Sequence, residues 1–375
     1  MDPGPLNSYL PTLIRYVLVA VSLCFIMYGV YKVQRFMGIN HEAAAGRALV
    51  TPWVIGFLIF SVFTIGSSLY LSFTEYNLFR APEWIGLGNY KELFSLDVAT
   101  LDSTEQRSSE VLASRHKEIA RLEFGDNGVV VGAKEDDFWR SMRLTLLYTV
   151  LSVPLGLIGA LGVALLLNQN VKGLGFWRVL YYAPAVLPAV ATALLWRWIF
   201  SSRGLLNTAM DPIYDVLDVS APSWFTDPSL ALPAFIIISL WGIFGANSVI
   251  LLAGLKGIPQ ELYEAASIDG AGEWTKFRRI TIPMLSPALF YNLIVSMIGA
   301  LQVFEIAAFI QTSDQVGTFL NWLIYREAFD FREMGMASAM AWIMLLIVVA
   351  LTVMVFRSSE AWVFYHGARE KEARA

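Results

Sequence analysis

Cysteine, histidine and charge are all scarce in this sequence. Its 375 residues include one cysteine, Cys24, and three histidines that lie far apart. A disulfide within the chain is therefore impossible, and a metal site built on cysteine or on clustered histidines is not expected. Charged residues make up 15% of the chain, against about 25% in soluble domains. With a hydrophobic content of 56%, this shortage of charge indicates a protein that lies largely in lipid.

The sequence also has no nucleotide-binding P-loop. A Walker A motif requires Lys followed by Ser or Thr, and none of the eight lysines meets that condition. The net charge of −4 gives no support to a nucleic-acid partner. No nucleophile, metal cluster or acid–base pair lies near the ends of the apolar runs. The sequence therefore predicts no catalytic residue, no metal ligand and no enzyme activity in this chain.

Long uncharged runs are abundant. Five of them have 23–28 residues, and two shorter ones reach a similar length if Arg15 and Arg197 extend to the headgroups. A helix needs about 20 apolar residues to cross a bilayer. We predict an all-α polytopic membrane protein with seven transmembrane helices, near 10–31, 51–73, 144–167, 180–200, 231–254, 287–310 and 335–356.

Lys and Arg are distributed unevenly between the loops. If the N-terminus is outside, the cytoplasmic segments 32–50, 168–179, 256–287 and the tail from 357 hold 13 of them, and the short outer segments hold three. Positive residues favour the cytoplasmic side, whereas a long loop such as 74–143 crosses largely regardless of its charge. We predict an outer N-terminus and a cytoplasmic C-terminus. A signal peptide is disfavoured because no positive charge precedes the first run.

The outer loop contains an insert, residues 97–137, with a more polar composition. Residues 103–123 are charged and amphipathic, which predicts a helix, and the sequence 125–128 predicts a hairpin around an Asn-Gly turn. We expect a small extracytoplasmic α+β insert. It is either a cap on the membrane domain or a docking surface for a soluble partner, and the sequence leaves both open.

Two patterns within the predicted spans concern helix geometry. Gly156, Gly159 and Gly162 follow a small-residue spacing that suits close contact between helices. Pro184 and Pro188 each remove a backbone donor, which predicts a bend at the start of the fourth span.

The cytoplasmic segment 256–287 has a distinct pattern. Pro259 suits the first turn of a helix and Gly270 suits its end, which predicts a short helix over 259–269, about 16 Å long. A basic stretch follows, and Pro283 and Pro287 are expected to break the chain before the next span. From composition alone, this helix could simply lie against the headgroups.

The spacing of this segment resembles a known signature. Glu264-Ala265-Ala266, Gly270 and Ile280-x-Ile282-Pro283 match the pattern E-A-A-x3-G-x9-I-x-L-P of bacterial ATP-binding-cassette importer permeases, with Ile282 where Leu is usual. The resemblance extends over about 50–357 and is strongest to the carbohydrate-uptake branch. The extra first helix and enlarged outer loop are similar to the larger permease subunit in importers of the maltose type.

The resemblance implies an organisation of the chain. It divides into an extra N-terminal helix and link (1–47), a six-helix permease core (48–357) that contains the insert (97–137) and a coupling loop (256–287), and a cytoplasmic tail (358–375). The short helix would be a coupling helix seated in a separate ATPase. The implied coupling residues are Glu261, Tyr263, Glu264, Ala265, Ala266, Ser267, Asp269 and Gly270.

The resemblance also implies partners and a location. The chain would lie in the bacterial plasma (inner) membrane and assemble with an ATP-binding-cassette ATPase dimer and a second permease subunit, the extra helix favouring a heterodimer. An extracytoplasmic solute-binding protein would deliver a sugar or polyol. This chain would bind no cofactor, because ATP and Mg belong to the ATPase. The alternative is an ion-coupled secondary transporter or channel, which would need acidic or histidine side chains at midspan.

Polar side chains inside the spans are candidates for the sugar pathway. They are costly in lipid and usually face the bundle interior or a water-filled cavity. Asn292 and Ser296 are expected to share one face of the sixth span, and Gln302 and Glu305 another. Each amide could instead form a hydrogen bond between helices. The candidate residues are Trp241, Phe244, Asn247, Asn292, Gln302, Phe304 and Glu305.

Overall fold

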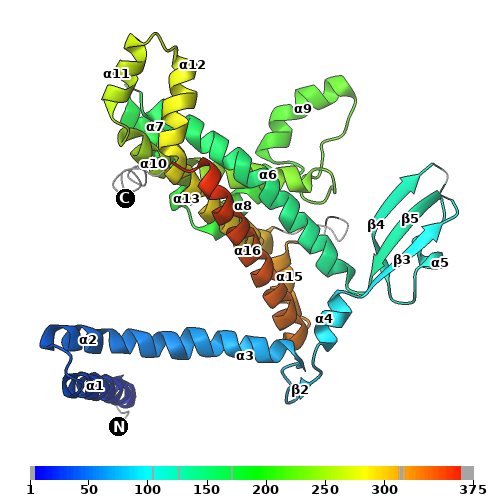
Figure 1. Ribbon diagram of the computed structural model, residues 1–375. Coiled ribbons are helices and arrows are strands. Elements are labelled where there is room, and N and C mark those ends of the chain that lie inside the picture. The colour runs from blue at the N-terminus through cyan, green and yellow to red at the C-terminus, as the bar shows by residue number, and fades with distance from the viewer. Residues whose placement is uncertain are drawn as a thin grey trace. The chain divides into compact units, whose positions relative to one another are not determined.

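The computed structural model describes residues 5–364 apart from 104, 126, 170, 171, 311, 313–315 and 317, and for 5–10 it gives the backbone (Figure 1). Most of the predicted tail, 358–375, therefore lies outside the described residues. The chain divides into two compact units, residues 1–71 and 72–375, which we describe separately.

The first unit consists of two long apolar helices. Helix α1 covers Pro5–Phe36. Helix α2 (His41–Phe57), the π-helical turn η1 (Leu58–Val62) and α3 (Phe63–Ser72) form a second continuous helix. Asn40 caps the start of α2, since its side-chain oxygen accepts a hydrogen bond from the Ala43 N–H at 2.9 Å. Both helices are long and apolar enough to cross a membrane.

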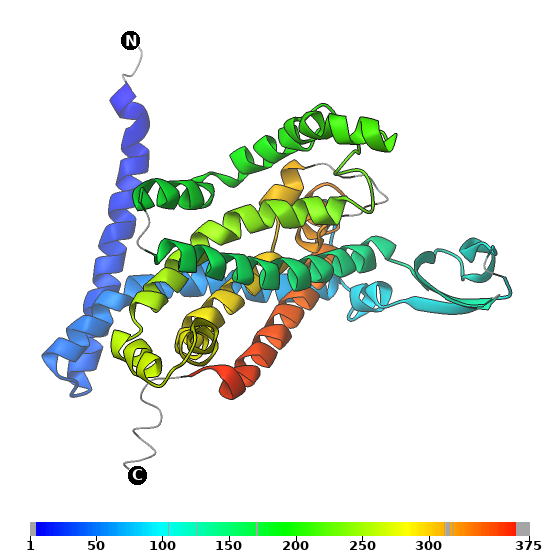
Figure 2. The same ribbon diagram turned by 90° about the horizontal axis from the view of Figure 1, so that it is seen from above.

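The insert forms a small antiparallel sheet in the second unit. A short pair, β1 (Thr74–Glu75) and β2 (Glu83–Trp84), and helix α4 (Gly88–Leu93) precede it. The sheet contains β3 (Leu96–Leu101), β4 (Lys117–Phe124) and β5 (Asn127–Ala133) in the order β3-β5-β4, with the short helix α5 (Ser108–Val111) between β3 and β4. The insert lies at one end of the long helices (Figure 2).

The predicted helix over 103–123 is wrong. Among its described residues, only Ser108–Val111 is helical, and Lys117–Phe124 is a strand paired with β5. Cross-strand contacts with the β-branched run Val129–Val131 override the local helical pattern. The predicted hairpin is present, but Phe124 pairs with Asn127, so Asn127 already lies in the strand and Gly125, with a φ of 68°, is at the turn.

Helices α6 (Asp136–Leu167) and α10 (Ala231–Lys256) form the most extensive helix pair. A Cβ added at Gly156 would lie 2.7 Å from Ile243, and one at Gly159 would lie 2.0 Å from the Phe244 ring. The predicted close contact is therefore confirmed at these two positions. It is wrong for Gly162, where nothing among the described residues lies within 4 Å of an added Cβ.

The predicted bend in the fourth span is confirmed, and it is larger than a kink. Helix α7 (Leu174–Val186) and α8 (Ala189–Ile199) meet at 103°. Pro188 cannot donate a backbone hydrogen bond and disfavours a helical conformation at the residue before it, so α7 ends at Val186 and Leu187 is extended. Helix α9 (Leu205–Leu217) follows in the loop between α8 and α10.

The prolines of the basic segment do not break the chain as predicted. Helix α11 (Gln260–Ile268) is followed by a continuous helix made of α12 (Glu273–Lys276), the π-helical η2 (Phe277–Thr281) and α13 (Ile282–Leu301). The wider π turn lies directly before Pro283. Pro287 lacks the donor for the Pro283 carbonyl, and the Ser286 hydroxyl donates to it instead at 2.6 Å.

The predicted sixth span, 287–310, is interrupted. Helix α13 ends at Leu301, and a short α14 (Glu305–Phe309) follows after a break. Gln302 and Glu305 therefore do not share one helical face as predicted. Helix α15 (Leu320–Phe329) follows, and α16 (Met334–Trp362) is the last long helix among the described residues.

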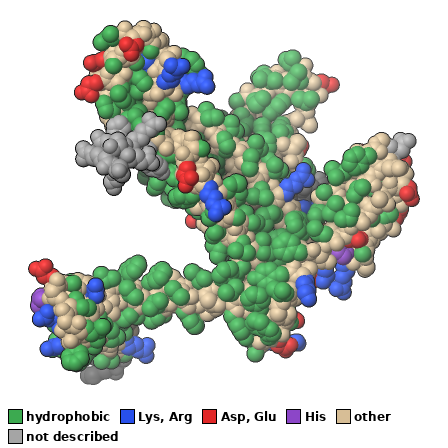
Figure 3. All heavy atoms as spheres, viewed as in Figure 1, with side chains coloured by type: hydrophobic (Ala, Val, Ile, Leu, Met, Phe, Trp, Pro, Cys, Tyr) green, Lys and Arg blue, Asp and Glu red, His purple; other side chains and the backbone are tan. Residues whose placement is uncertain are grey.

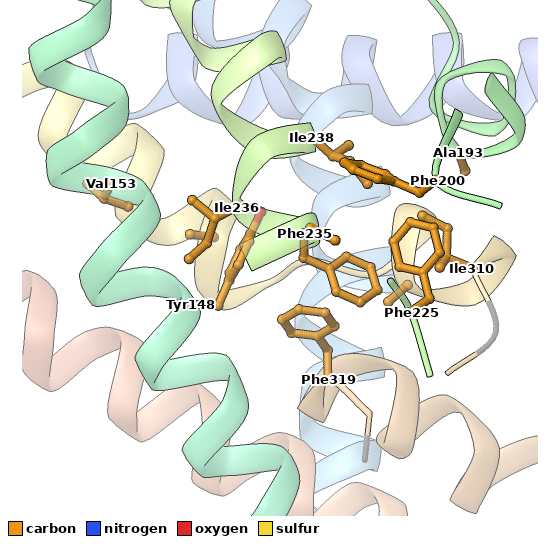
Figure 4. Packing of buried hydrophobic residues seen from close by; sticks show 13 residues of the cluster. Tyr148, Val153, Ala193, Phe200, Phe225, Phe235, Ile236, Ile238, Ile310 and Phe319 are labelled. Carbon is orange, nitrogen blue, oxygen red and sulfur yellow. The ribbon is translucent and has the colours of Figure 1, made fainter. Parts of the chain in front are cut away.

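The count of membrane spans agrees with the sequence prediction. Within the described residues, six helices are long and apolar enough to cross a membrane, or seven if α7 and α8 count as one broken span, which confirms the predicted class. An aromatic cluster of Tyr148 from α6, Phe235 from α10 and Phe319 is buried in the second unit (Figure 4). The Phe235 and Phe319 rings meet edge to face with centroids 4.9 Å apart.

Candidate functional site

Helix α11 has a sharply defined end. Gly270 has a φ of 78°, its N–H donates to the Ser267 carbonyl at 3.1 Å, and the Ala271 N–H donates to the Ala266 carbonyl at 2.8 Å. This is a Schellman motif, which needs a left-handed residue and so favours glycine. The prediction that Gly270 ends the helix is confirmed. The chain then turns back through α12, so that α11 and α12 form a hairpin (Figure 1).

One side of α11 is fixed to the bundle and the other is free. The Tyr263 hydroxyl lies 3.0 Å from the Thr281 hydroxyl, and its ring packs against the cluster around Leu255 and Leu285. Ile268, an apolar residue, is 87% exposed. Of the predicted coupling residues, Tyr263 and Ala266 are half-buried, and the exposed ones are Glu261, Glu264, Ala265, Ser267, Asp269 and Gly270.

A cavity of about 410 Å³ lies between the broken span, α10 and α13. Its described lining is mostly apolar and contains no charged side chain. Its polar and aromatic groups include Tyr148, Thr192, Ser239, Trp241, Asn247 and Ser296. A set of few hydroxyls, one amide and aromatic rings can bind a polar but uncharged molecule that has apolar faces.

Asn247 is the central polar group of this cavity. It is 9% exposed, and its Nδ2 donates to the Ser296 Oγ at 2.8 Å, joining α10 to α13. Trp241 precedes Asn247 on α10, and its ring meets the Trp196 ring of α8 edge to face, with centroids 5.6 Å apart. Asn247 thus both lines the cavity and makes the hydrogen bond between helices that the sequence offered as the alternative.

The other predicted pathway residues lie elsewhere. Asn292 is 1% exposed, its amide donates to the Ala288 carbonyl at 3.0 Å, and its buried Oδ1 has no partner among the described residues. Phe244 packs over Gly159. Phe304 contacts the stacked rings of Trp322 and Tyr325. Gln302 and Glu305 are exposed at the break after α13.

Sequence reasoning missed part of the cavity and a second, charged one. Tyr148 of α6 lines the first cavity, and Trp196 of α8 contacts the Trp241 ring, but neither position is marked by a local sequence pattern. This second cavity, of about 590 Å³, is lined by Lys117, Asp136, Asp137, Arg140, Trp322 and Arg326, among others. Asp136 is buried and pairs with Lys117 at 3.0 Å and with Arg140 at 3.5 Å.

Burial is the main cause of the raised carboxyl pKa values near this second cavity. It raises the pKa of Glu327 to about 7, and the neighbouring Glu135, Glu333 and Asp137 add to the shift. The pKa of Glu135 is also raised, again mainly by burial. These carboxylates come from three segments: the start of α6, α15 and the residue directly before α16.

Comparisons with known proteins agree with this architecture. The Probable ABC transporter permease protein YesP of Bacillus subtilis is 36% identical over 91% of this chain and 99% of its own length. The trehalose/maltose permease protein MalF of Thermococcus litoralis is 34% identical over 61% and 76%. A bacterial ABC transporter involved in alginate import has a chain of the same fold, with a TM-score of 0.65 and 22% identity over 84% of this chain and 94% of that one.

A family model gives the assignment directly. Residues 152–361, which include the broken span, the α11 loop and all of the cavity lining except Tyr148, match the model of the binding-protein-dependent transport system inner membrane component. The resemblance drawn from the motif at 264–283 is therefore confirmed, and the chain belongs to this family of transport permeases.

Proposed function

We propose that this chain is a permease subunit of an ATP-driven, binding-protein-dependent importer and forms part of the pathway for a sugar or related polyol. The observation that carries the proposal is helix α11, which is held at the bundle by Tyr263 and presents Ile268 to its surroundings. Relatives that carry trehalose, maltose or lactose in their names support the class of cargo.

Energy reaches this chain through α11. The chain has no P-loop, so hydrolysis takes place on a separate ATPase dimer that carries ATP and Mg. The exposed side of α11 seats in that ATPase, and its movement is transmitted along the continuous helix α12–α13, to which the Tyr263–Thr281 contact joins it. A stiff helix can carry such a displacement because its backbone hydrogen bonds form an unbroken series apart from the π turn.

The cavity beside α10 and α13 is one half of the cargo site. Trp241 supplies a flat apolar surface for a sugar ring, and Asn247 and Ser296 supply hydrogen bonds to its hydroxyls. A second permease, a different chain, closes the open side, and an extracytoplasmic binding protein delivers the sugar to the outer mouth. Of the sequence candidates, Asn247 and Trp241 remain proposed pathway residues.

The test is ATP-dependent uptake in proteoliposomes that hold the complex assembled with its ATPase. Replacing Ile268 with Glu places a charge on the docking surface, so we expect the ATPase to be lost from the purified complex and uptake to fall more than tenfold. Ile268→Leu keeps the apolar surface and serves as the matched control. Normal uptake by Ile268→Glu would contradict the role of α11, and uptake without ATP would favour an ion-coupled transporter.

A further inference from the structure

Helix α9 presents three different faces. Asn207, Met210 and Tyr214 face the protein and are buried or half-buried. Thr208, Asp211 and Asp215 form an exposed polar face. The third face is apolar and exposed: Leu205, Ile213 and Val216 are 57%, 51% and 84% exposed. Residues at these spacings share a face because the helix repeats every 3.6 residues.

The helix is held rigidly in this orientation by Asn207, which is 1% exposed. Its Nδ2 donates to the carbonyls of Ser201, Ser202 and Pro222 at 3.0–3.3 Å. Its Oδ1 accepts from the Tyr214 hydroxyl at 3.2 Å and from the Trp224 Nε1 at 2.9 Å. One side chain thus ties both ends of the loop 201–224 to α9, and the apolar face is not free to rotate inward.

The position of α9 in the chain indicates what covers that face. The helix follows α8 and precedes α10, so the loop that contains it begins and ends at the outer end of membrane-spanning segments. Trp198, at the end of α8, is 59% exposed, and Trp is the side chain most typical of the headgroup level. In Figure 3 the helix stands clear of its neighbours, with mostly hydrophobic side chains and acidic groups at its tip.

We infer that α9 is an interfacial helix whose apolar face, formed by Leu205, Ile213 and Val216 with the adjacent exposed Leu217, is inserted into the outer leaflet of the bilayer. A helix with one apolar and one polar face lies in the plane of the interface and buries its apolar side about 5–10 Å into the boundary of headgroups and acyl chains. The helix contains two acidic residues, Asp211 and Asp215, and no Lys or Arg, and Asp218 caps its C-terminal end. Insertion is therefore driven by apolar burial and does not need anionic lipid.

This inference depends on the membrane fold and not on the proposed cargo or energy source. It fixes where the outer end of the broken span sits relative to the bilayer, because the Asn207 hydrogen bonds join α9 to the residues directly after α8. A helix anchored in the leaflet would hold that end of α8 at a constant depth while the rest of the bundle moves.

The test uses spin labels on single cysteines in the assembled complex, in nanodiscs of phosphatidylcholine and of phosphatidylcholine with phosphatidylglycerol. Cys24 is the one cysteine of the chain and is first replaced by Ser. Labels at Val216 and Ile213 report the apolar face, and labels at the adjacent Asp215 and Asp211 are the matched controls. We expect collisions with oxygen to exceed those with a water-soluble nickel complex at Val216 and Ile213, at a depth of roughly 5–10 Å, and the reverse at the aspartate positions.

Each other outcome overturns the inference. Access of the nickel complex to all four labels would place α9 in water. Immobile labels at Val216 and Ile213 that neither reagent reaches would mean that a protein surface covers the face. Insertion that requires phosphatidylglycerol would show that electrostatic attraction, and not apolar burial, drives it.

Discussion

At the scale of single residues, a group of neighbouring carboxylates around the half-buried Glu327 couples stability to pH. The pKa of Glu327 is raised to about 7, first by burial and then by Glu135, Glu333 and Asp137, with Arg326 acting in the opposite direction. A carboxyl whose pKa is higher in the folded state binds its proton more tightly there, so stability falls as pH rises from about 4.5 to 7 and is constant above that. Because Gln resembles the protonated form, we expect Glu327→Gln to raise the thermal unfolding midpoint of the purified complex at pH 8 by roughly 2 °C, after allowance for solvent screening, and to change it little at pH 5. Glu105→Gln, at an exposed position of the insert, is the control and should leave the midpoint unchanged at both values. An equal gain at pH 5 and pH 8 would show that charge is not the cause.

At the scale of elements, the close contact between α6 and α10 depends on Gly156 and Gly159. A Cβ at Gly159 would lie 2.0 Å from the Phe244 ring, whereas one at Gly162, a single turn further on the same helix, meets nothing among the described residues within 4 Å. We expect Gly159→Ala to destabilise the protein by about 1–3 kcal/mol, because the Phe244 ring must move in a packed interface. Gly162→Ala should be neutral or slightly stabilising, since alanine favours the helix. Thermal unfolding of the two variants in the same detergent tests this directly, and equal midpoints would refute the proposed contact.

At the scale of the whole molecule, the distribution of Lys and Arg predicts the orientation. The insert should be outside and the α11 hairpin in the cytoplasm. In a Cys24→Ser background, we expect a membrane-impermeant maleimide to label Glu105→Cys in intact cells, because this position is exposed and the insert that carries it is predicted to lie outside. It should label Ser267→Cys, an exposed position of α11, only after permeabilisation. Labelling of Ser267→Cys in intact cells would reverse the orientation and would also remove the basis for coupling to a cytoplasmic ATPase.

The sequence alone determined the membrane class, the approximate spans, the end of α11 at Gly270 and the family. These features depend on local properties: the length of apolar runs, the positive φ that glycine tolerates, and the fixed spacing of a motif. Tertiary contacts decided the rest. Residues 117–124 became a strand because Val129–Val131 lay opposite them. Asn247 became a cavity residue because α13 brought Ser296 within 2.8 Å, whereas Asn292, equally polar in sequence, was enclosed by its own bundle. Which face of a helix meets a cavity, a neighbour or lipid depends on distant segments, and no local pattern encodes it.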